Sequence, residues 1–210
     1  MRRQLVVLAR WPVPDRCKRR LAAGIGPGRA ARVQHRLTHH TMACCRRFRQ
    51  LAAGRIAVEL LLAADPLGRR AAWRWARALG ADRGVSQGRG SLGLRLQRQL
   101  QRARREGAAQ VVLIGSDLPM LAPLDLMAAF EALDQAPLVV GPAADGGYWL
   151  IGLSCRAAPA LAGRLFSGMP WGGPAVLERT MAAAATLGVE PRLLGERRDL
   201  DRPDDLAPWR

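Results

Sequence analysis

Short apolar runs alternate along this chain with stretches whose apolar residues recur every three or four positions. Runs of aliphatic and β-branched residues predict buried strands, and the three-to-four spacing predicts amphipathic helices. The predicted strands are 5–9, 56–63, a weak one around Val85, 110–115, 137–141, 148–153 and 189–194. The predicted helices are about 33–51, 73–79, 91–103 with Ser91 as its cap, one beginning at Pro123, and about 174–187.

This alternation is typical of βαβ units and predicts a largely parallel sheet in an α/β fold. The sequence contains no internal repeat and no clear linker, so we expect one domain over residues 1–210. Ligands of such sheets bind beyond the carboxyl ends of the strands. The chemistry is therefore expected just after Ala9, Gly115, Gly141 and Leu194.

Composition narrows the class of protein further. Apolar residues make up 49% and charged residues 24% of the 210 positions, which excludes disordered, collagen-like and coiled-coil chains. The apolar runs are all far shorter than the ~20 residues of a membrane span, and the first one is too short for a signal peptide. We therefore expect a cytoplasmic protein, with its four cysteines as reduced thiols.

Positive charge is concentrated in the first half of the chain. Residues 1–110 carry 25 basic and five acidic side chains, a net charge of +20, whereas residues 111–210 carry eight basic and 12 acidic ones. Such an imbalance indicates a polyanionic partner, either nucleotide phosphates or nucleic acid. The alternative is a general bias toward arginine, with the charges on solvated helix faces.

The segment after the first predicted strand is the strongest candidate for phosphate binding. Its prolines, Pro12 among them, stiffen an extended loop, and Arg10, Arg16, Lys18 and Arg20 place cations just before a helix. Lys18 is the only lysine among 33 basic residues, which indicates that a compact ammonium matters there. The alternative is a solvated lysine without a role. The loop lacks the Walker pattern of P-loop proteins.

Aspartates follow two other predicted strands. Asp117 comes two residues after the run that ends at Gly115, where a carboxylate can hold Mg²⁺ together with substrate phosphates. Asp199 and Asp201 would face the same way in an extended segment and could complete that metal site. The alternative for each is a turn or a helix cap.

Two glycine-rich segments offer close approach of the backbone to a ligand. Asp145, Gly146, Gly147 and Tyr148 follow the strand 137–141, and a tight turn is the alternative reading. Three further glycines match the GxGxxG spacing of dinucleotide-binding folds, but the strand before them is weak, so a flexible loop contacting a base or phosphate is preferred. These three glycines are Gly88, Gly90 and Gly93.

Six motifs occur in an order that resembles a known family. They read ARWPVPDRCKRRLAAGIGP, QGRGSLGLRL, GSDLPML, GPAADGGYWLIGL, LFSGMPWGGPAVLERT and RDLDRPDDL. Together they resemble the radical-SAM/selenodomain-associated transferase 1 family of the nucleotide-diphospho-sugar transferase superfamily. That family is similar to 2-phospholactate and molybdenum-cofactor guanylyltransferases, and the likeness covers nearly the whole chain.

The resemblance implies a three-layer α/β/α GT-A-like fold with a mixed, mainly parallel sheet. It implies that Lys18 and Arg20 bind donor phosphates and that the loop from Gln87 to Gly93 lies near the nucleobase. It further implies that Asp117 is the main Mg²⁺ ligand, with Asp199 or Asp201 as a second. The segment from Asp145 to Tyr148 would then form the acceptor side.

The chain departs from the family pattern at a few positions. The family usually has Gly in place of Asp15, Thr in place of Arg19, Asp in place of Ser91, and a Ser/Thr pair in place of Gly172 and Gly173. An extra carboxylate at position 15 repels phosphate, although four nearby cations can offset it. These departures indicate either a shifted substrate or a loss of activity.

We therefore expect a transferase that uses Mg²⁺ (or Mn²⁺) and a nucleotide donor. In the favoured version, a nucleoside triphosphate passes its nucleotidyl group to a small phosphorylated or carboxylated acceptor. In the alternative version, a nucleotide-sugar passes on its glycosyl group. Two further alternatives are a basic nucleic-acid-binding protein on the same fold, which is less favoured, and a catalytically silent relative. The base, the acceptor and the oligomeric state are left open.

Overall fold

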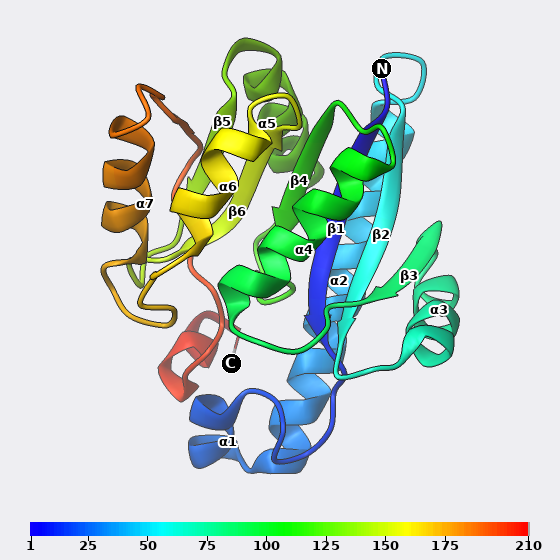
Figure 1. Ribbon diagram of the computed structural model, residues 1–210. Helices are drawn as coiled ribbons and strands as arrows, with labels where there is room; N and C mark the ends of the chain where they lie inside the picture. The colour runs from blue at the N-terminus through cyan, green and yellow to red at the C-terminus, as the bar shows by residue number, and fades with distance from the viewer. Residues whose placement is uncertain (210) are drawn as a thin grey trace.

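The computed structural model describes residues 1–209, in which a seven-stranded sheet lies between two layers of helices (Figure 1). Arg210, the last residue of the predicted domain, lies outside the described residues. The strands, which match the seven predicted runs, are β1 (Arg3–Arg10), β2 (Val58–Asp65), β3 (Arg83–Ser86), β4 (Gln110–Ile114), β5 (Leu138–Pro142), β6 (Tyr148–Ser154) and β7 (Arg192–Leu193). Their order across the sheet is β3-β2-β1-β4-β6-β5-β7.

All strand pairings are parallel except the two that β6 makes, because β6 runs antiparallel to both β4 and β5. The expectation of a mixed, mainly parallel sheet is thereby confirmed. The reversal follows from the short turn between β5 and β6, which leaves no room for a crossover helix. The carboxyl ends of β1, β2, β3, β4 and β5 consequently meet at one edge of the sheet.

The helices comprise all five that were predicted with residue positions and three further ones. In the described part of the chain they are α1 (Arg19–Ile25), α2 (Pro27–Leu51), α3 (Arg69–Ala78), α4 (Leu92–Arg105), α5 (Pro123–Gln135), α6 (Ala158–Phe166), α7 (Val176–Ala185) and the 3₁₀ helix η1 (Pro203–Trp209). Of these three, α1 follows the cationic loop, where the sequence indicated a helix without giving its bounds, and α6 and η1 were not predicted. Within residues 1–209, every helix is too short or too polar to cross a membrane.

The missed helix α6 owes its existence to burial. Gly163 lowers the helix propensity of this nine-residue segment, whereas Pro159 lies in the first turn, where proline is tolerated. Leu161, Leu165 and Phe166 nevertheless lie on one side of the helix and are buried in the core beneath α4 and α6. Tertiary packing thus overrides a poor local propensity, as it does for most short helices.

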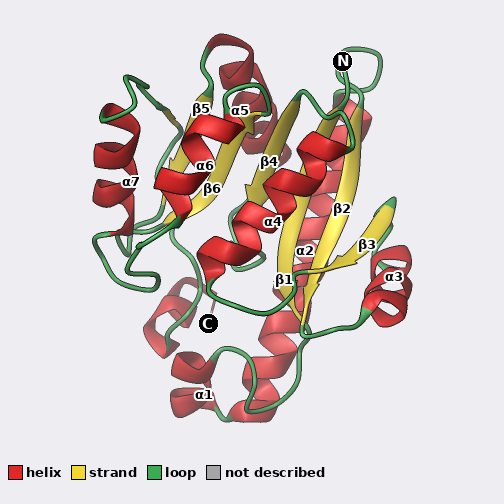
Figure 2. Ribbon diagram, in the orientation of Figure 1, coloured by secondary structure: helices red, strands yellow, loops and turns green. Residues whose placement is uncertain are grey.

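The side chains of β1 alternate between the two faces of the sheet, and each face has its own half of the core. Helices α2 and α5 cover one face of the sheet, and α4 and α6 cover the other (Figure 2). Leu5 and Val7 belong to the half of the core under α2 and α5, and Val6 belongs to the half under α4 and α6. Because successive side chains of a strand face opposite ways, a strand buried on both sides has to be apolar throughout. This explains why the strands appear in the sequence as continuous apolar runs.

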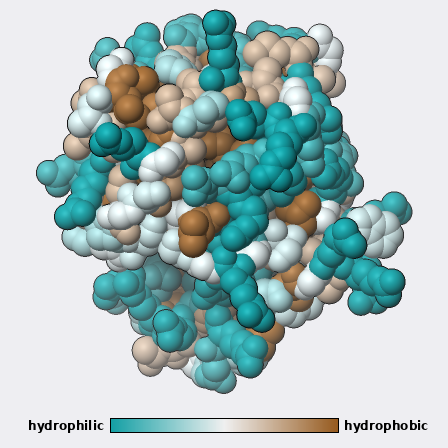
Figure 3. Space-filling view, viewed as in Figure 1, coloured by the Kyte–Doolittle hydropathy of each residue, from teal (hydrophilic) through white to brown (hydrophobic). Residues whose placement is uncertain are grey.

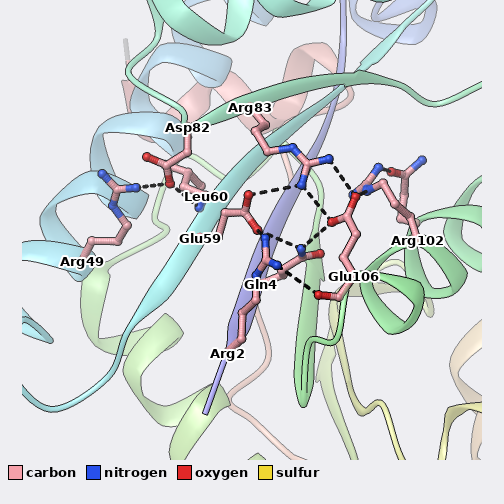
Figure 4. A network of polar contacts seen from close by, with 10 residues as sticks. Arg2, Gln4, Arg49, Glu59, Leu60, Asp82, Arg83, Arg102 and Glu106 are labelled. Carbon is pink, nitrogen blue, oxygen red and sulfur yellow. Dashed lines mark hydrogen bonds and ion pairs between the residues drawn. The ribbon is translucent and has the colours of Figure 1, made fainter.

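Polar side chains tie together the amino ends of β1, β2 and β3 (Figure 4). Gln4 Nε2 donates to Glu59 Oε2 at 2.9 Å and to Glu106 Oε2 at 2.8 Å. Arg83 donates to both oxygens of Glu106, at 2.9 and 2.7 Å. The hydrogen bonds from Arg83 lower the pKa of Glu106 to about 2. The network therefore joins the end of α4 to the sheet, on the edge opposite the predicted chemistry.

Replacing the Glu106 carboxylate is expected to lower the free energy of unfolding by an amount that depends on pH. The pKa of Glu106 is lowered in the folded state, so its ionised form stabilises the fold above its usual pKa, and the contribution fades as pH falls toward 2. We expect E106Q to lose about 1–2 kcal/mol of unfolding free energy at pH 7, because solvent screens part of the interaction. Urea unfolding at pH 7 and pH 3 should show the difference between E106Q and wild type shrinking at the lower pH. A difference that is equal at both pH values would contradict this assignment.

Candidate functional site

A cavity of about 580 Å³ opens at the edge of the sheet where the carboxyl ends of the strands meet. In Figure 1 this edge faces down, toward α1 and the C-terminal segment. Residues that follow β1, β4 and β5 line it together with the segment 199–201, as expected from the topology. The candidate residues that line it are Arg10, Lys18, Arg20, Gln87, Gly90, Asp117, Asp145, Gly147, Tyr148, Asp199 and Asp201.

Five candidate residues lie outside the lining of the cavity: Pro12, Arg16, Gly88, Gly93 and Gly146. Two of these glycines are required by packing. A Cβ on Gly93 would lie 2.1 Å from the carbonyl oxygen of Phe166, so the residue lets α4 approach α6. A Cβ on Gly146 would lie 2.0 Å from the carbonyl oxygen of Pro174, and its φ of +85° also favours glycine.

Lys18 is held beneath the cavity with its ammonium group fully enclosed. Its side chain is only 2% exposed, and its backbone adopts a left-handed conformation with φ of 48° just before α1. Nζ donates to the carbonyl oxygen of Leu200 at 2.6 Å and lies 2.9 Å from Oδ1 of Asp117. The single lysine of the chain thus connects the loop after β1, the end of β4 and the C-terminal segment.

Asp117 presents a carboxylate to the cavity. Its side chain is 45% exposed, although its Oδ1 atom is buried against Lys18. Oδ1 faces the ammonium off the hydrogen-bonding direction and accepts no hydrogen bond from the described residues. Its backbone is fixed, because the carbonyl oxygen accepts the N–H of Leu200 at 2.9 Å. The carboxylate is therefore rigidly placed and retains acceptor capacity.

Asp199 and Asp201 both line the cavity but have different surroundings. Burial raises the pKa of Asp199, and the nearby charge of Asp145 raises it further. Asp201 Oδ2 instead pairs with Arg20 Nη1 at 3.1 Å. Among residues 1–209, the Asp199 carboxylate forms no ion pair, whereas that of Asp201 does.

These carboxylates fit a divalent cation that also binds substrate. Among residues 1–209, His, Cys, Asp and Glu side chains nowhere gather in threes as a ready-made metal site. Asp117 and Asp199 offer two carboxylates beside a cavity, and Mg²⁺ commonly binds one or two carboxylates and completes its shell with phosphates and water. The Asp117 side chain is 45% exposed although Oδ1 is buried against Lys18, so the rest of the carboxylate is open to the cavity, which supports this fit.

An ion-pair cluster on the opposite wall was missed from the sequence. Asp65 Oδ2 lies 2.7 Å from Arg95 Nη1 and 3.4 Å from Arg10 Nε, and all three residues line the cavity. Asp65 ends β2, so the rule that located Asp117 could have located it as well. Arg95 lies inside α4, where nothing in the sequence distinguishes it from the other arginines.

Gln87 supports this wall rather than offering its amide to a ligand. Its Nε2 donates to the carbonyl oxygens of Ala9 and Ala63, at 3.2 and 2.9 Å, and its Oε1 accepts from Arg95 at 3.3 Å. The side chain is therefore committed to the carboxyl ends of β1 and β2. Gln87 acts as a positioning residue for Arg95.

The remaining wall is aromatic and lies beside β6. The hydroxyl group of Tyr148 is buried without a hydrogen-bond partner among the described residues, and burial raises its pKa. The Tyr148 ring packs edge-to-face against Trp171 at 6.1 Å between ring centres. Asp145 Oδ1 accepts the N–H of Gly147 at 2.9 Å, which makes this segment a tight turn as well as a wall of the cavity.

With this geometry in place, comparison with known proteins identifies the family. Residues 49–173 match the family described as "Uncharacterized protein conserved in bacteria (DUF2064)". The chain belongs to the DUF2064 family. This DUF2064 protein is also 31% identical to a phosphoenolpyruvate guanylyltransferase from Rubrobacter xylanophilus, over 90% of the chain and 85% of the relative. A phosphoenolpyruvate guanylyltransferase from Chloroflexus aggregans is 29% identical, over 84% and 81%.

A solved structure shares the fold of this DUF2064 protein. It is a nucleotide-diphospho-sugar transferase candidate from Desulfovibrio desulfuricans G20, 25% identical, with a TM-score of 0.78 over 95% of this chain and 82% of that one. The expected GT-A-like fold is confirmed by this likeness. The relatives are transferases that act on nucleotides, which confirms the expectation of a nucleotide-using transferase.

Proposed function

We propose that this DUF2064 protein transfers a nucleotidyl group from a nucleoside triphosphate to a small phosphorylated or carboxylated acceptor. The observation that carries the proposal is the buried Lys18 ammonium beside Asp117, at a cavity edged by further arginines. The names of the curated relatives make GTP the first donor to test and phosphoenolpyruvate the first acceptor. We also propose that one domain carries the reaction and that the chain is a radical-SAM/selenodomain-associated transferase 1 protein.

The basic side chains of the cavity would bind and orient the donor. Arg10, Arg20 and Arg95 reach the cavity from three different elements and can contact phosphate oxygens. Lys18 holds Asp117 in place and adds positive charge beneath the phosphates. An acceptor oxygen attacks the α-phosphorus, the bond from that phosphorus to the bridging oxygen breaks, and pyrophosphate leaves. The protein contributes mainly positioning and electrostatic stabilisation to such a step.

Mg²⁺ or Mn²⁺ is the proposed cofactor, with Asp117 and Asp199 as the residues that hold it. When bound, the ion supplies polarisation of the donor phosphates and neutralises charge on the leaving group. Asp201 is the weaker candidate for a ligand, because its carboxylate already pairs with Arg20. Its role in the proposal is to keep Arg20 at the rim of the cavity.

Glycosyl transfer from a nucleotide-sugar is the second candidate. The likeness to a nucleotide-diphospho-sugar transferase candidate, with a TM-score of 0.78, favours it. The aromatic wall of Tyr148 and Trp171 offers the kind of flat apolar surface that stacks on a sugar ring. The two candidates use the same cavity and differ in the bond that breaks.

Product analysis separates the candidates. The purified protein is incubated with Mg²⁺, phosphoenolpyruvate and each of the four nucleoside triphosphates, and pyrophosphate and the new diphosphate ester are measured. Parallel reactions contain nucleotide-sugars, and release of nucleoside diphosphate is measured. The proposal expects pyrophosphate release with one triphosphate. Nucleoside diphosphate released only from a nucleotide-sugar would replace it with the second candidate.

A further inference from the structure

A second groove, of about 830 Å³, lies between α3 and the edge strand β3. Its lining shares no residue with the cavity described above. Hydrophilic side chains project over this part of the surface, at the right of Figure 3. The residues that line the groove are Arg69, Arg70, Trp73, Arg74, Arg83, Gly84, Val85 and Ser86.

A close approach of helix and strand places an indole ring in this groove. A Cβ on Gly84 would lie 2.2 Å from the carbonyl oxygen of Ala72, so glycine lets α3 lie directly on β3. Trp73, the next residue of α3, is consequently held over the strand and is 50% exposed. Its neighbour Trp75 is only 7% exposed and belongs to the core. An exposed tryptophan on a fixed helix face is a rigid stacking surface.

The arginines around this indole have no acidic partners. Arg77 places its guanidinium 5.3 Å from the centre of the Trp73 ring. In the part of the chain that the structure describes, four exposed arginines of α3 form neither ion pairs nor side-chain hydrogen bonds: Arg69, Arg70, Arg74 and Arg77. They span about 12 Å of helix.

Nearby carboxylates do not neutralise this charge, because other arginines already engage them. Glu59 and Glu106 pair with Arg83 at 3.3 and 2.7 Å. Asp82 pairs with Arg49 and accepts the N–H of Leu60. The groove therefore carries a net positive charge beside an exposed aromatic ring.

We propose that the groove binds single-stranded nucleic acid, with phosphates on the α3 arginines and a base on the open face of Trp73. Positive grooves with an aromatic stacking surface are typical of single-strand binding. An acidic peptide that adds a strand to β3 fits less well, because β3 has only four residues and its Arg83 is already paired with Glu59 and Glu106. The proposal is independent of the reaction in the cavity.

Fluorescence anisotropy with a fluorescein-labelled ten-nucleotide oligouridylate tests the proposal on the full-length protein. W73L should weaken binding about 5- to 100-fold without changing its salt dependence, and W73F should retain most of the affinity. R70A/R74A should weaken binding and reduce the slope of log affinity against log salt by about 1.4, because two phosphate contacts are lost.

The matched control is R104A/R105A. Arg104 and Arg105 are exposed residues of α4, which packs on the other face of the sheet from α3, and their removal changes the net charge equally. We expect this variant to bind like wild type. Equal weakening by both double variants, unchanged binding by W73L, or equally tight binding of a labelled ten-residue polyglutamate would each overturn the proposal.

Discussion

D117N is expected to lower turnover by about 10²- to 10³-fold, the largest effect among the cavity variants. The substitution keeps the size of the side chain and removes one negative charge from a carboxylate that is fixed beside Lys18. In the proposed reaction the variant loses a metal ligand and the charge that orients the phosphates, which is worth several kcal/mol of transition-state stabilisation. Steady-state kinetics over a range of Mg²⁺ concentrations should show the loss in kcat and a weaker dependence on Mg²⁺.

D201N is the matched control for D117N. Asp201 also lines the cavity, but its carboxylate pairs with Arg20, whose side chain is 57% exposed. Exposed ion pairs contribute little, so we expect turnover to fall less than about tenfold. A loss in D201N as large as that in D117N would contradict the weaker role assigned to Asp201. Full turnover in D117N would exclude Asp117 from the reaction.

K18M is expected to reduce both turnover and stability. The Lys18 ammonium is enclosed, and its loss leaves the Leu200 carbonyl and the Asp117 carboxylate without their partner. A buried acceptor or charge that loses its partner costs about 1–3 kcal/mol of unfolding free energy. We expect about a hundredfold loss in turnover, since in the proposed reaction Lys18 holds Asp117 in place and adds positive charge beneath the donor phosphates. Urea unfolding and steady-state kinetics measure the two effects separately.

Two further variants serve as controls for K18M: R19M and the double variant K18M/D117N. Arg19 is an exposed neighbour, so R19M removes the same charge and should leave stability within about 0.5 kcal/mol of wild type. In K18M/D117N both partners are replaced, so neither leaves an unpaired group behind. The loss of unfolding free energy in the double variant should therefore be smaller than the sum of the losses in the two single variants. Strict additivity would show that Lys18 and Asp117 do not act as a pair.

The site could be located from the sequence because it depends on topology. A parallel sheet gathers the carboxyl ends of its strands, so residues after Ala9 and Gly115 had to be neighbours. Continuous apolar runs marked the strands, since both faces of the sheet are covered. The rule brought Arg10, Asp117 and Asp145 to one cavity without knowledge of the helices between them.

Features that depend on tertiary contact could not be predicted. Gly93 matched a ligand-binding spacing, but the approach of α4 to Phe166 determines its role. Arg95 is one of many arginines, and only its distance of 2.7 Å from Asp65 distinguishes it. Helix α6 has a poor helical sequence and is held by burial in the core.

Two of the departures from the family pattern preserve the local backbone. Asp15 has a φ of 64°, a left-handed conformation that glycine favours and that aspartate tolerates better than most residues. Ser91 caps α4 by accepting the N–H of Leu94 at 3.4 Å, a role that aspartate also performs.

Gly172 and Gly173 both line the cavity, and a Cβ on Gly172 would meet no atom within 4 Å. The glycine pair at 172 and 173 therefore leaves space on the side of the cavity near Trp171.

Thermal unfolding with saturating nucleoside triphosphates, each with and without Mg²⁺, tests the central claim that the cavity binds a nucleotide donor. A ligand at 100 times its Kd stabilises the folded state by about 2.7 kcal/mol, which raises Tm by about 5–10 °C in a chain of this size. We expect such a shift with one triphosphate, dependent on Mg²⁺ and absent in D117N. Unchanged Tm with every triphosphate and nucleotide-sugar would contradict the claim and would indicate a fold that is retained without its chemistry.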